Sequence, residues 1–183
     1  MTLALVPVDS QGVHAARRWR NASMAGLRTP HPLNVEMQEE FYRDVICNRQ
    51  ASARYWMVEG SRSMMLDGIA HTTRLDVAMV GLNPIQWENG CGELSLVVDP
   101  AEAGKGTGAA AVALVLAEAF DRLRLLTVHA ECYESNPALG FWRKMAERWG
   151  AWETVYPRRK FWNGRLVDSV LFTFPEETWR ERR

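Results

Sequence analysis

The chain alternates between short apolar runs, which are typical of strands, and longer segments with apolar residues at helical spacing. The element order that this pattern predicts is βααβββαβαββ. The predicted strands are residues 2–8, 53–58, 77–82, 91–98, 125–132, 152–161 and 165–174. The predicted helices are residues 11–22, 34–48, 109–120 and 137–149.

Capping residues mark the ends of the predicted helices. Asp9-Ser10 and Asn34 are good N-caps for the first two helices. Asn136 as N-cap and Pro137 at the first helical position mark the start of the last helix, and Gly150 ends it. Helical spacing predicts buried faces that contain Val13, Ala16, Trp19, Met37, Phe41, Val45, Ile46, Leu139, Trp142, Met145 and Ala146.

Turn signals and connection types predict how the strands pair. Asn-Gly pairs at residues 89–90 and 163–164 predict two antiparallel hairpins. Residues 59–61 predict a turn, residues 61–76 a loop with a short strand, and residues 29–32 a loop. The strand–helix–strand segment around the glycines predicts a parallel pair. These signals together predict an α/β fold with a mixed sheet and helices on both faces.

Composition narrows the class of protein. A chain of 183 residues with 47% hydrophobic residues is long enough for one domain over residues 1–183. The 22 basic and 22 acidic residues cancel, which argues against nucleic acid as a partner. No apolar run approaches the ~20 residues of a membrane span, and no signal peptide is evident. We therefore expect a cytoplasmic protein without a membrane partner.

The cysteine pattern predicts neither a disulfide framework nor a metal site. Cys47, Cys91 and Cys132 are scattered and odd in number, and none belongs to a CxxC pair or lies beside spaced histidines. We expect no metal ion.

A glycine-rich turn within residues 94–119 is the candidate for chemistry. A strand ends at Asp99-Pro100, and Gly104, Gly106 and Gly108 then precede an alanine-rich helix. The first N–H groups of a helix have no helical partner, and the helix dipole favours negative charge. The turn therefore predicts a site for a phosphate group.

Two well-known phosphate motifs fit this turn incompletely. A P-loop needs G-x-x-x-x-G-K-[ST], and the chain has no Ser or Thr at the position that binds magnesium. Gly104–Ala109 fits the dinucleotide pattern G-x-G-x-x-A, with Glu131 where a ribose-binding acid is expected. However, residues 99–103 intervene between strand and glycines, and too little chain follows for a doubly wound sheet. Dinucleotide binding is therefore kept only as an alternative, ranked below the functions given at the end of this section.

The segment "LSLVVDPAEAGKGTGAAA" resembles motif A of the GCN5-related N-acetyltransferases (GNAT), with Gly106 and Gly108 at its two small positions. The departure is Ala103, where that family usually has Gln or Arg. The segment "YESNPALGFWRKM" resembles motif B, with Trp142 in the position of the usual tyrosine. The C-terminal "PRRKFWNGRLVDSVLFTFPEETW" resembles the branch that acetylates ribosomal-protein N-termini or nucleotide amino-sugars. The resemblance implies a mostly antiparallel sheet with splayed central parallel strands.

The resemblance implies acetyl-CoA as acyl donor and assigns residues to it. Backbone groups of Leu96 and Val98 would pair with the pantetheine arm like an added strand. Asn136 would contact the same arm, while its alternative role is the helix N-cap. The pyrophosphate would lie on the loop formed by Ala103, Gly104, Lys105, Gly106, Thr107, Gly108 and Ala109. A Cβ in this loop is expected to block the phosphate, which would explain the glycines.

Catalytic roles follow from the same resemblance and from residue chemistry. Glu93 opens the motif A strand and is the candidate base, acting through water, although a solvated edge charge would look the same. Glu131 and Glu134 are weaker candidates. Because Trp142 cannot donate a useful proton, Tyr133 is the candidate acid.

Four other features have competing interpretations. Cys132 suits a buried free thiol better than a nucleophile, and His129 suits a core histidine. Asp168 would either orient an acceptor amine or pair with a nearby arginine. Residues 158–160 are a basic run that would grip an anionic acceptor or simply be solvated.

We therefore expect an N-acetyltransferase that moves an acetyl group from acetyl-CoA to a primary amine of a small, amino-sugar-like molecule. Transfer would be direct, in a ternary complex. The alternatives are a protein or peptide N-terminal acetyltransferase and a non-catalytic acyl-CoA-binding domain. A homodimer is compatible with this expectation.

Overall fold

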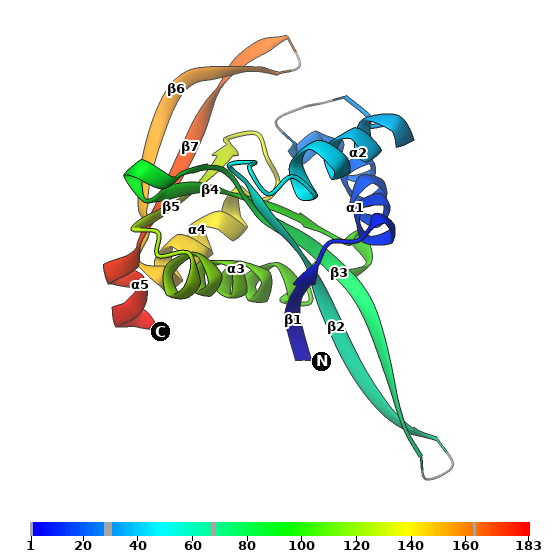
Figure 1. Ribbon diagram of the computed structural model, residues 1–183. Coiled ribbons are helices and arrows are strands. Elements are labelled where there is room, and N and C mark those ends of the chain that lie inside the picture. The colour runs from blue at the N-terminus through cyan, green and yellow to red at the C-terminus, as the bar shows by residue number, and fades with distance from the viewer. Residues whose placement is uncertain (1, 28–30, 67–68, 163) are drawn as a thin grey trace. The chain divides into compact units, whose positions relative to one another are not determined.

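The computed structural model describes residues 2–27, 31–66, 69–162 and 164–183 (Figure 1). Its strands are β1 (Thr2–Pro7), β2 (Arg54–Leu66), β3 (Ile69–Gln86), β4 (Cys91–Val98), β5 (Thr127–Tyr133), β6 (Trp152–Trp162) and β7 (Arg165–Pro175). Its α-helices are α1 (Ser10–Ala22), α2 (Val35–Phe41), α3 (Thr107–Ala117), α4 (Leu139–Trp149) and α5 (Glu176–Arg182). The predicted order is confirmed, and α5 is added after it. No described helix is long and apolar enough to cross a membrane.

The described strands form one sheet in the order β1-β2-β3-β4-β5-β7-β6. β4 and β5 pair in parallel, whereas β1 with β2 and β7 with both β5 and β6 are antiparallel. The predicted α/β class with a mixed, mostly antiparallel sheet is therefore confirmed.

The residues group into two compact units. The first unit comprises Met1–Ala22, Pro32–Gly81 and Leu96–Val115. The second unit comprises Ser23–His31, Leu82–Ser95 and Leu116–Arg183. The chain crosses between them inside β3, β4 and α3, so both units share these elements. The single domain over residues 1–183 stays a prediction.

Helix α1 packs on the sheet of the first unit through the residues predicted to be inward. The Asp9 carboxylate accepts a hydrogen bond from the Gly12 N–H at 2.7 Å, as expected of an N-cap. A Cβ on Gly12 would lie 2.9 Å from Cγ of Met57, so this glycine permits close packing of α1 on β2. The core there contains Val8, Val13, Ala15, Ala16, Trp19, Met57 and Met79.

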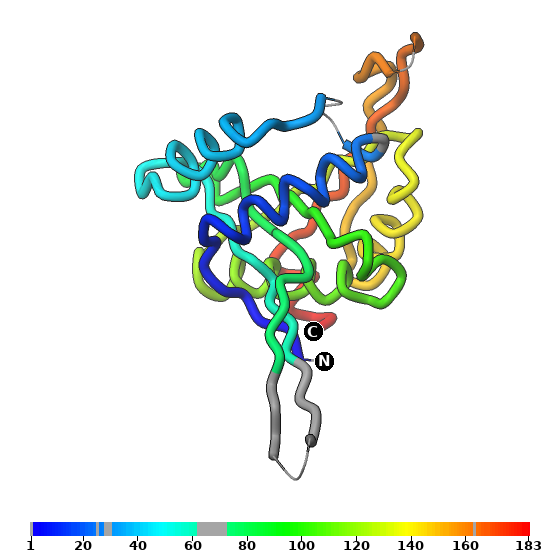
Figure 2. The backbone as a smooth tube through the Cα atoms, turned by 90° about the vertical axis from the view of Figure 1, so that its right-hand side faces the viewer, coloured from blue at the N-terminus to red at the C-terminus, as the bar shows by residue number. Residues whose placement is uncertain are grey.

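Helix α2 lies beside α1 and keeps its predicted cap (Figures 1 and 2). The Asn34 side chain accepts a hydrogen bond from the Met37 N–H at 2.8 Å. The predicted helix over residues 34–48 is α-helical only as far as Phe41, and one π-helical turn, Tyr42–Ile46, follows it directly. The predicted inward position of Met37 is wrong: Met37 is 49% exposed, and its neighbour Gln38 is buried.

β2 and β3 are much longer than predicted and are neighbours in the sheet (Figure 1). The predicted turn at residues 59–61 and the loop at residues 61–76 are wrong, because β2 continues to Leu66 and β3 begins at Ile69. β1 supplies the reason, since it pairs with Glu59, Gly60 and Ser61 and fixes them in a strand. This tertiary pairing overrides the local turn preference. Part of the predicted loop at residues 29–32, and Asn163 of the second Asn-Gly pair, lie outside the described residues.

The second unit is built on β5 and β7, with α4 packed against both strands. The predicted inward residues Trp142, Met145 and Ala146 are buried, and Gly150 ends α4 with a φ of 68°. Helix α4 begins at Leu139 with Ala138 as N-cap, so the predicted N-cap role of Asn136 is wrong. The Asn136 side chain instead forms a local turn by accepting from the Ala138 N–H at 2.8 Å.

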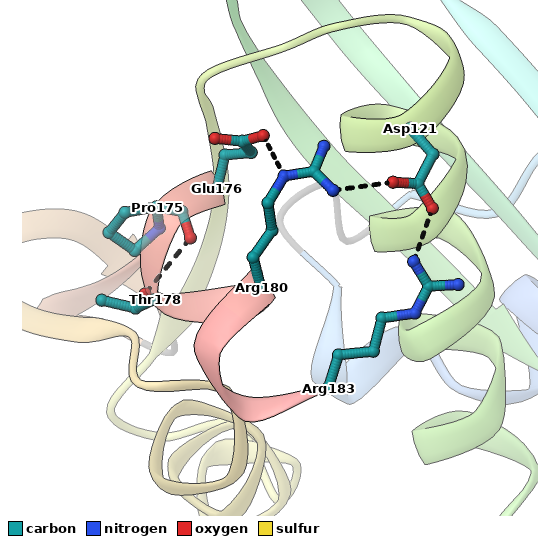
Figure 3. A network of polar contacts seen from close by, with 6 residues as sticks. All are labelled: Asp121, Pro175, Glu176, Thr178, Arg180 and Arg183. Carbon is teal, nitrogen blue, oxygen red and sulfur yellow. Dashed lines mark hydrogen bonds and ion pairs between the residues drawn. The ribbon is translucent and has the colours of Figure 1, made fainter.

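The C-terminal helix α5 is anchored in the second unit by one buried tryptophan and by charged contacts. Trp179 is buried, with its ring 5.2 Å from the ring of Phe120. Asp121 accepts hydrogen bonds from Arg180 Nη1 at 3.2 Å and from Arg183 Nη1 at 2.8 Å (Figure 3). The short length of α5 and its charged sequence hide it from periodicity analysis.

Candidate active site

The glycine turn lies in the first unit, between the end of β4 and the start of α3. The Asp99 side chain accepts a hydrogen bond from the Ala101 N–H at 2.9 Å and starts a 3-10 turn over Pro100–Glu102. Gly104 and Gly106 follow with φ values of +76° and +85°. Glycine is required there because other residues rarely adopt this left-handed conformation.

The predicted steric reason for these glycines concerns a bound phosphate and stays a prediction. A Cβ on Gly104 or Gly106 would meet nothing within 4 Å. The requirement that the structure shows is therefore conformational.

Several N–H groups of the turn remain available for an anion. The N–H of Ala103 donates to the Pro100 carbonyl at 3.2 Å, and that of Lys105 donates to the Glu102 carbonyl at 3.3 Å. The described hydrogen bonds use none of the N–H groups of Gly104, Gly106, Thr107, Gly108 and Ala109. These groups lie at the N-terminus of α3, an 11-residue helix whose dipole adds to their attraction for an anion.

The side chains around the turn partly neutralise one another. Lys105 Nζ lies 3.1 Å from Glu102 Oε1, and the buried Thr107 hydroxyl donates to Glu102 Oε2 at 3.5 Å. A phosphate on this turn would compete with Glu102 for Lys105. The backbone N–H groups are thus the stronger part of the site.

Leu96 and Val98 occupy alternate positions of β4 in the first unit. Val97, between them, packs against the core of that unit. Because successive side chains of a strand point to opposite faces, Leu96 and Val98 point away from that core.

The parallel pairing of β4 with β5 is short. It joins Cys91 to Thr127, Gly92 to Val128 and Glu93 to His129, while β5 pairs with β7 along its whole length. Glu93 and His129 therefore form the last pair, as expected where parallel strands splay.

A pocket of about 230 Å³ lies in the second unit beside this last pair. Its lining contains Pro84, Gln86, Cys91, Gly92, Glu93, His129, Glu131, Tyr156, Arg159 and Leu171. The candidate base Glu93 and the weaker candidate Glu131 both line it, whereas Glu134 does not. Among the described residues, no cluster of His, Cys, Asp and Glu side chains is arranged to hold a metal ion.

Glu131 is held in place by two partners. Its Oε1 accepts from Arg159 Nε at 3.0 Å and from the hydroxyl of the buried Ser169. The Glu131 side chain is only 9% exposed, against 56% for Arg159. The carboxylate therefore lies beside a cation at the pocket wall.

His129 is half-buried and hydrogen-bonded, with Nδ1 3.2 Å from the Thr173 hydroxyl. Burial lowers the pKa of His129 below 6.5, and the nearby Glu93 charge acts in the opposite direction. His129 is therefore the hydrogen-bonded, partly buried histidine that the sequence predicted. It also lines the pocket, as a neutral imidazole at pH 7.

Two other predicted site residues lie outside the pocket lining. Tyr133 is buried at the end of β5, and Lys160 Nζ lies 4.8 Å from the centre of its ring. Asn136 Nδ2 donates to the Gly26 carbonyl at 2.6 Å, and its Oδ1 accepts from Ala138. The roles of Tyr133 as acid and of Asn136 as a contact of the pantetheine arm stay predictions.

Asp168 and the basic run have roles that the sequence did not indicate. Asp168 Oδ1 accepts a hydrogen bond from the Arg158 backbone N–H at 2.8 Å, not from an arginine side chain. Arg159 pairs with Glu131, although its side chain is 56% exposed, and Lys160 lies over Tyr133. Both interpretations of the run stay predictions. Spacing along β6 could not place Tyr156 and Arg159 in one pocket, because the strand is irregular between them.

Cys132 is the buried free thiol that the sequence predicted. Burial raises its pKa to about 12, with a smaller opposite effect from Arg143. A thiol in this state is no nucleophile.

Residues 2–151 match the family described as acetyltransferase (GNAT) domain. The chain belongs to this family. The predicted resemblance, the acetyltransferase class and acetyl-CoA as donor are thereby confirmed. The finer placement in the ribosomal-protein or amino-sugar branch stays a prediction.

Solved structures with the same fold include spermidine N-acetyltransferases from Vibrio cholerae. Mutant forms of the spermidine/spermine N-acetyltransferase SpeG share 18% identity at a TM-score of 0.79, over 98% of this chain and 97% of that one. The enzyme in complex with CoA and spermine shares 19% identity at a TM-score of 0.78, over 97% and 98%. A structure of the Vibrio cholerae enzyme described as dodecameric shares 19% sequence identity at a TM-score of 0.73, over 98% of this chain and 97% of that one. The search of curated proteins found no match.

Proposed function

We propose that this GNAT domain transfers the acetyl group of acetyl-CoA directly to the primary amine of a small molecule. The observation that carries the proposal is the pocket of the second unit, where Glu93 and the neutral His129 lie side by side. Two proton-accepting groups beside a small cavity suit an amine that must lose a proton before it attacks.

The donor is assigned to the first unit. The N–H groups of Gly104 and of residues 106–109, which the described hydrogen bonds leave free, would bind the pyrophosphate, which needs no side chain at Ala103. Backbone groups of Leu96 and Val98 would pair with the pantetheine arm, as the family resemblance implies.

The acceptor is assigned to the second unit. A cavity of about 230 Å³ lies below the roughly 300–1,000 Å³ of drug-sized pockets, which favours a small amine over a protein N-terminus. One structural neighbour is described in complex with CoA and spermine, so polyamines join amino-sugars as acceptors to test.

The reaction needs one proton transfer before attack and one after it. An amine with a pKa of about 10.4 is protonated at pH 7, and Glu93 would take its proton through water, with His129 beside it. The nitrogen lone pair then forms the N–C bond, and a backbone N–H of β4 would stabilise the oxyanion. The C–S bond breaks as the intermediate collapses, and the CoA thiolate takes a proton, which we assign to Tyr133. The attacking nitrogen then loses its second proton, which restores the proton of the Tyr133 hydroxyl through water.

The decisive test is release of CoA thiol from acetyl-CoA over a panel of primary amines. We expect turnover with at least one small amine and a loss of about 10²–10⁴-fold in kcat for Glu93→Gln. The matched control is Glu88→Gln, in the turn before β4 and outside the pocket lining. An unchanged pH–rate profile for Glu93→Gln would refute its role as base.

A second candidate is a non-catalytic acyl-CoA-binding domain. It is favoured by Trp142, which replaces the usual tyrosine and is buried against Phe172 at a ring distance of 6.4 Å. Binding of CoA without turnover of any amine would support this candidate.

We keep the homodimer as the proposed assembly, with the dodecamer described for one structural neighbour as the larger alternative. Sedimentation of the purified chain distinguishes the two.

A further inference from the structure

Arg159 reaches the pocket because strand β6 contains a bulge. The register of β6 against β7 shifts between Tyr156, which pairs with Ser169, and Lys160, which pairs with Val167. Residues 157–159 therefore lie opposite the single residue Asp168. Bulges of this kind re-aim side chains and are frequent beside active sites.

The bulge is fixed by a specific backbone contact. Arg158 has a φ of 51°, a conformation that non-glycine residues rarely adopt, and its N–H donates to Asp168 Oδ1 at 2.8 Å. The carboxylate stabilises the turn of the chain that directs the next residue, Arg159, into the pocket.

The guanidinium of Arg159 is attached along one edge. Its Nε donates to Glu131 at 3.0 Å, and its Cζ lies 5.1 Å from the ring centre of Tyr156. The side chain remains 56% exposed. Its terminal nitrogens are thus presented by a preordered group, and a guanidinium binds carboxylates and phosphates with two parallel hydrogen bonds.

The charges of the pocket lining are consequently separated. Glu93 and the neutral His129 lie at the β4–β5 pair, whereas Arg159 lies on β6, where its Nε is paired with the Glu131 carboxylate. The charges of this ion pair cancel, so discrimination rests on the terminal nitrogens of Arg159. An oxyanion can accept hydrogen bonds from these nitrogens, whereas a second ammonium group has only donors.

We propose that the acceptor is a primary amine that also carries an oxyanion, a carboxylate or a phosphate, which binds to Arg159. The proposal rests on the proposed function and specifies its substrate class. Arg159 is then a specificity-determining residue, and Asp168 is a positioning residue that acts through the bulge.

The test compares matched amines of equal chain length: an aminoalkyl carboxylate, an aminoalkyl phosphate, an amino alcohol and a diamine. In the wild type we expect kcat/KM to be at least tenfold higher for an oxyanionic amine than for the amino alcohol, with the diamine lowest. Whichever oxyanion is preferred identifies the natural group.

Arg159→Gln should abolish the preference through KM, so that kcat/KM for the oxyanionic amine falls to that of the amino alcohol measured in the same variant. Arg159→Lys should keep part of the preference, since it retains the charge but not the planar fork. The charge-matched control is Arg165→Gln, an exposed residue on β7 outside the pocket lining, which should keep the full preference. A wild type that prefers the diamine, or a preference that survives Arg159→Gln, overturns the proposal.

Asp168→Ala tests the positioning role. We expect it to lose the oxyanion preference while kcat for the amino alcohol is retained, because only the placement of Arg159 changes. Retention of the full preference would contradict this role.

Calorimetric binding of the same amines separates the two proposals. Turnover without charge preference refutes the oxyanion site and leaves the acetyltransferase intact. Binding that depends on Arg159, without turnover of any amine, supports the oxyanion site and refutes the proposed function. If no amine is turned over and none binds in a way that depends on Arg159, both the proposed function and the oxyanion site are refuted.

Discussion

The environment of His129 links the candidate site to the stability of the protein. Burial lowers the pKa of this imidazole below its ordinary value of 6.5, so the folded state holds it neutral. In the unfolded chain the same group takes up a proton as the pH falls through 6.5. The unfolded state then binds more protons than the folded state, and stability falls with falling pH.

We therefore predict that His129 contributes stability above pH 6.5 that is lost as the pH falls toward its folded pKa. Urea unfolding at pH 7.5 and pH 5.5 measures the effect. His129→Gln should lose less stability than the wild type between these values. If the wild type and His129→Gln lose the same free energy of unfolding between these two pH values, His129 is not the source of the effect.

The three cysteines give a second prediction at the scale of single residues. Cys47 is exposed and should react with a disulfide reagent at once, whereas Cys132 should react only after unfolding, because burial raises its pKa to about 12. Cys91 lines the pocket, so an acceptor amine should slow its labelling. Mass spectrometry of the labelled peptides identifies each site, and rapid labelling of Cys132 in the native protein would refute the prediction.

Single residues were predictable from sequence where their role is local. Asp9 and Asn34 are caps, and Gly150 ends a helix, because each acts on neighbours within four residues. The basic run at residues 158–160 was recognised as a candidate anion site, but the pairing of Arg159 with Glu131 was not predictable. Glu131 lies 28 residues away, and the bulge changes the register of β6 beside Arg159.

Helices and strands, like single residues, were predictable where their signal is local and not where a distant segment decides it. Strands and helices with regular periodicity were found in the right order, but β1 keeps residues 59–61 in a strand against their local preference. Helix α5 was missed because one tryptophan, rather than a periodic apolar face, attaches it.

Trp179 should therefore account for most of the anchoring of α5. We predict that Trp179→Ala lowers the free energy of unfolding by about 3–5 kcal/mol. Trp179→Phe should cost less, since it keeps an aromatic ring and removes a buried indole N–H that has no partner among the described residues. Trp152→Ala, at a residue that is 63% exposed, is the control and should cost well under 1 kcal/mol. Equal losses for the two alanine variants in chemical denaturation would show that α5 is not held by Trp179.

At the scale of the whole molecule, the donor and acceptor assignments fall in different units. The glycine turn belongs to the first unit and the pocket to the second, while β3, β4 and α3 contribute residues to both. Donor binding should therefore be measurable without an acceptor.

Thermal unfolding with CoA tests the donor site on the intact chain. A ligand at 100 times its Kd adds about 2.7 kcal/mol to the stability of the folded state, which for a chain of this length raises Tm on the order of 5–10 °C. Gly106→Ala should reduce the shift, because alanine is strained at a φ of +85° and changes the direction of the N–H groups. Gly140→Ala is the matched control: its Cβ would also meet nothing within 4 Å, and it lies in α4, where alanine is favoured. Since the turn also fits a dinucleotide pattern, NAD is the competing ligand, and a shift with NAD but not with CoA would refute the donor assignment.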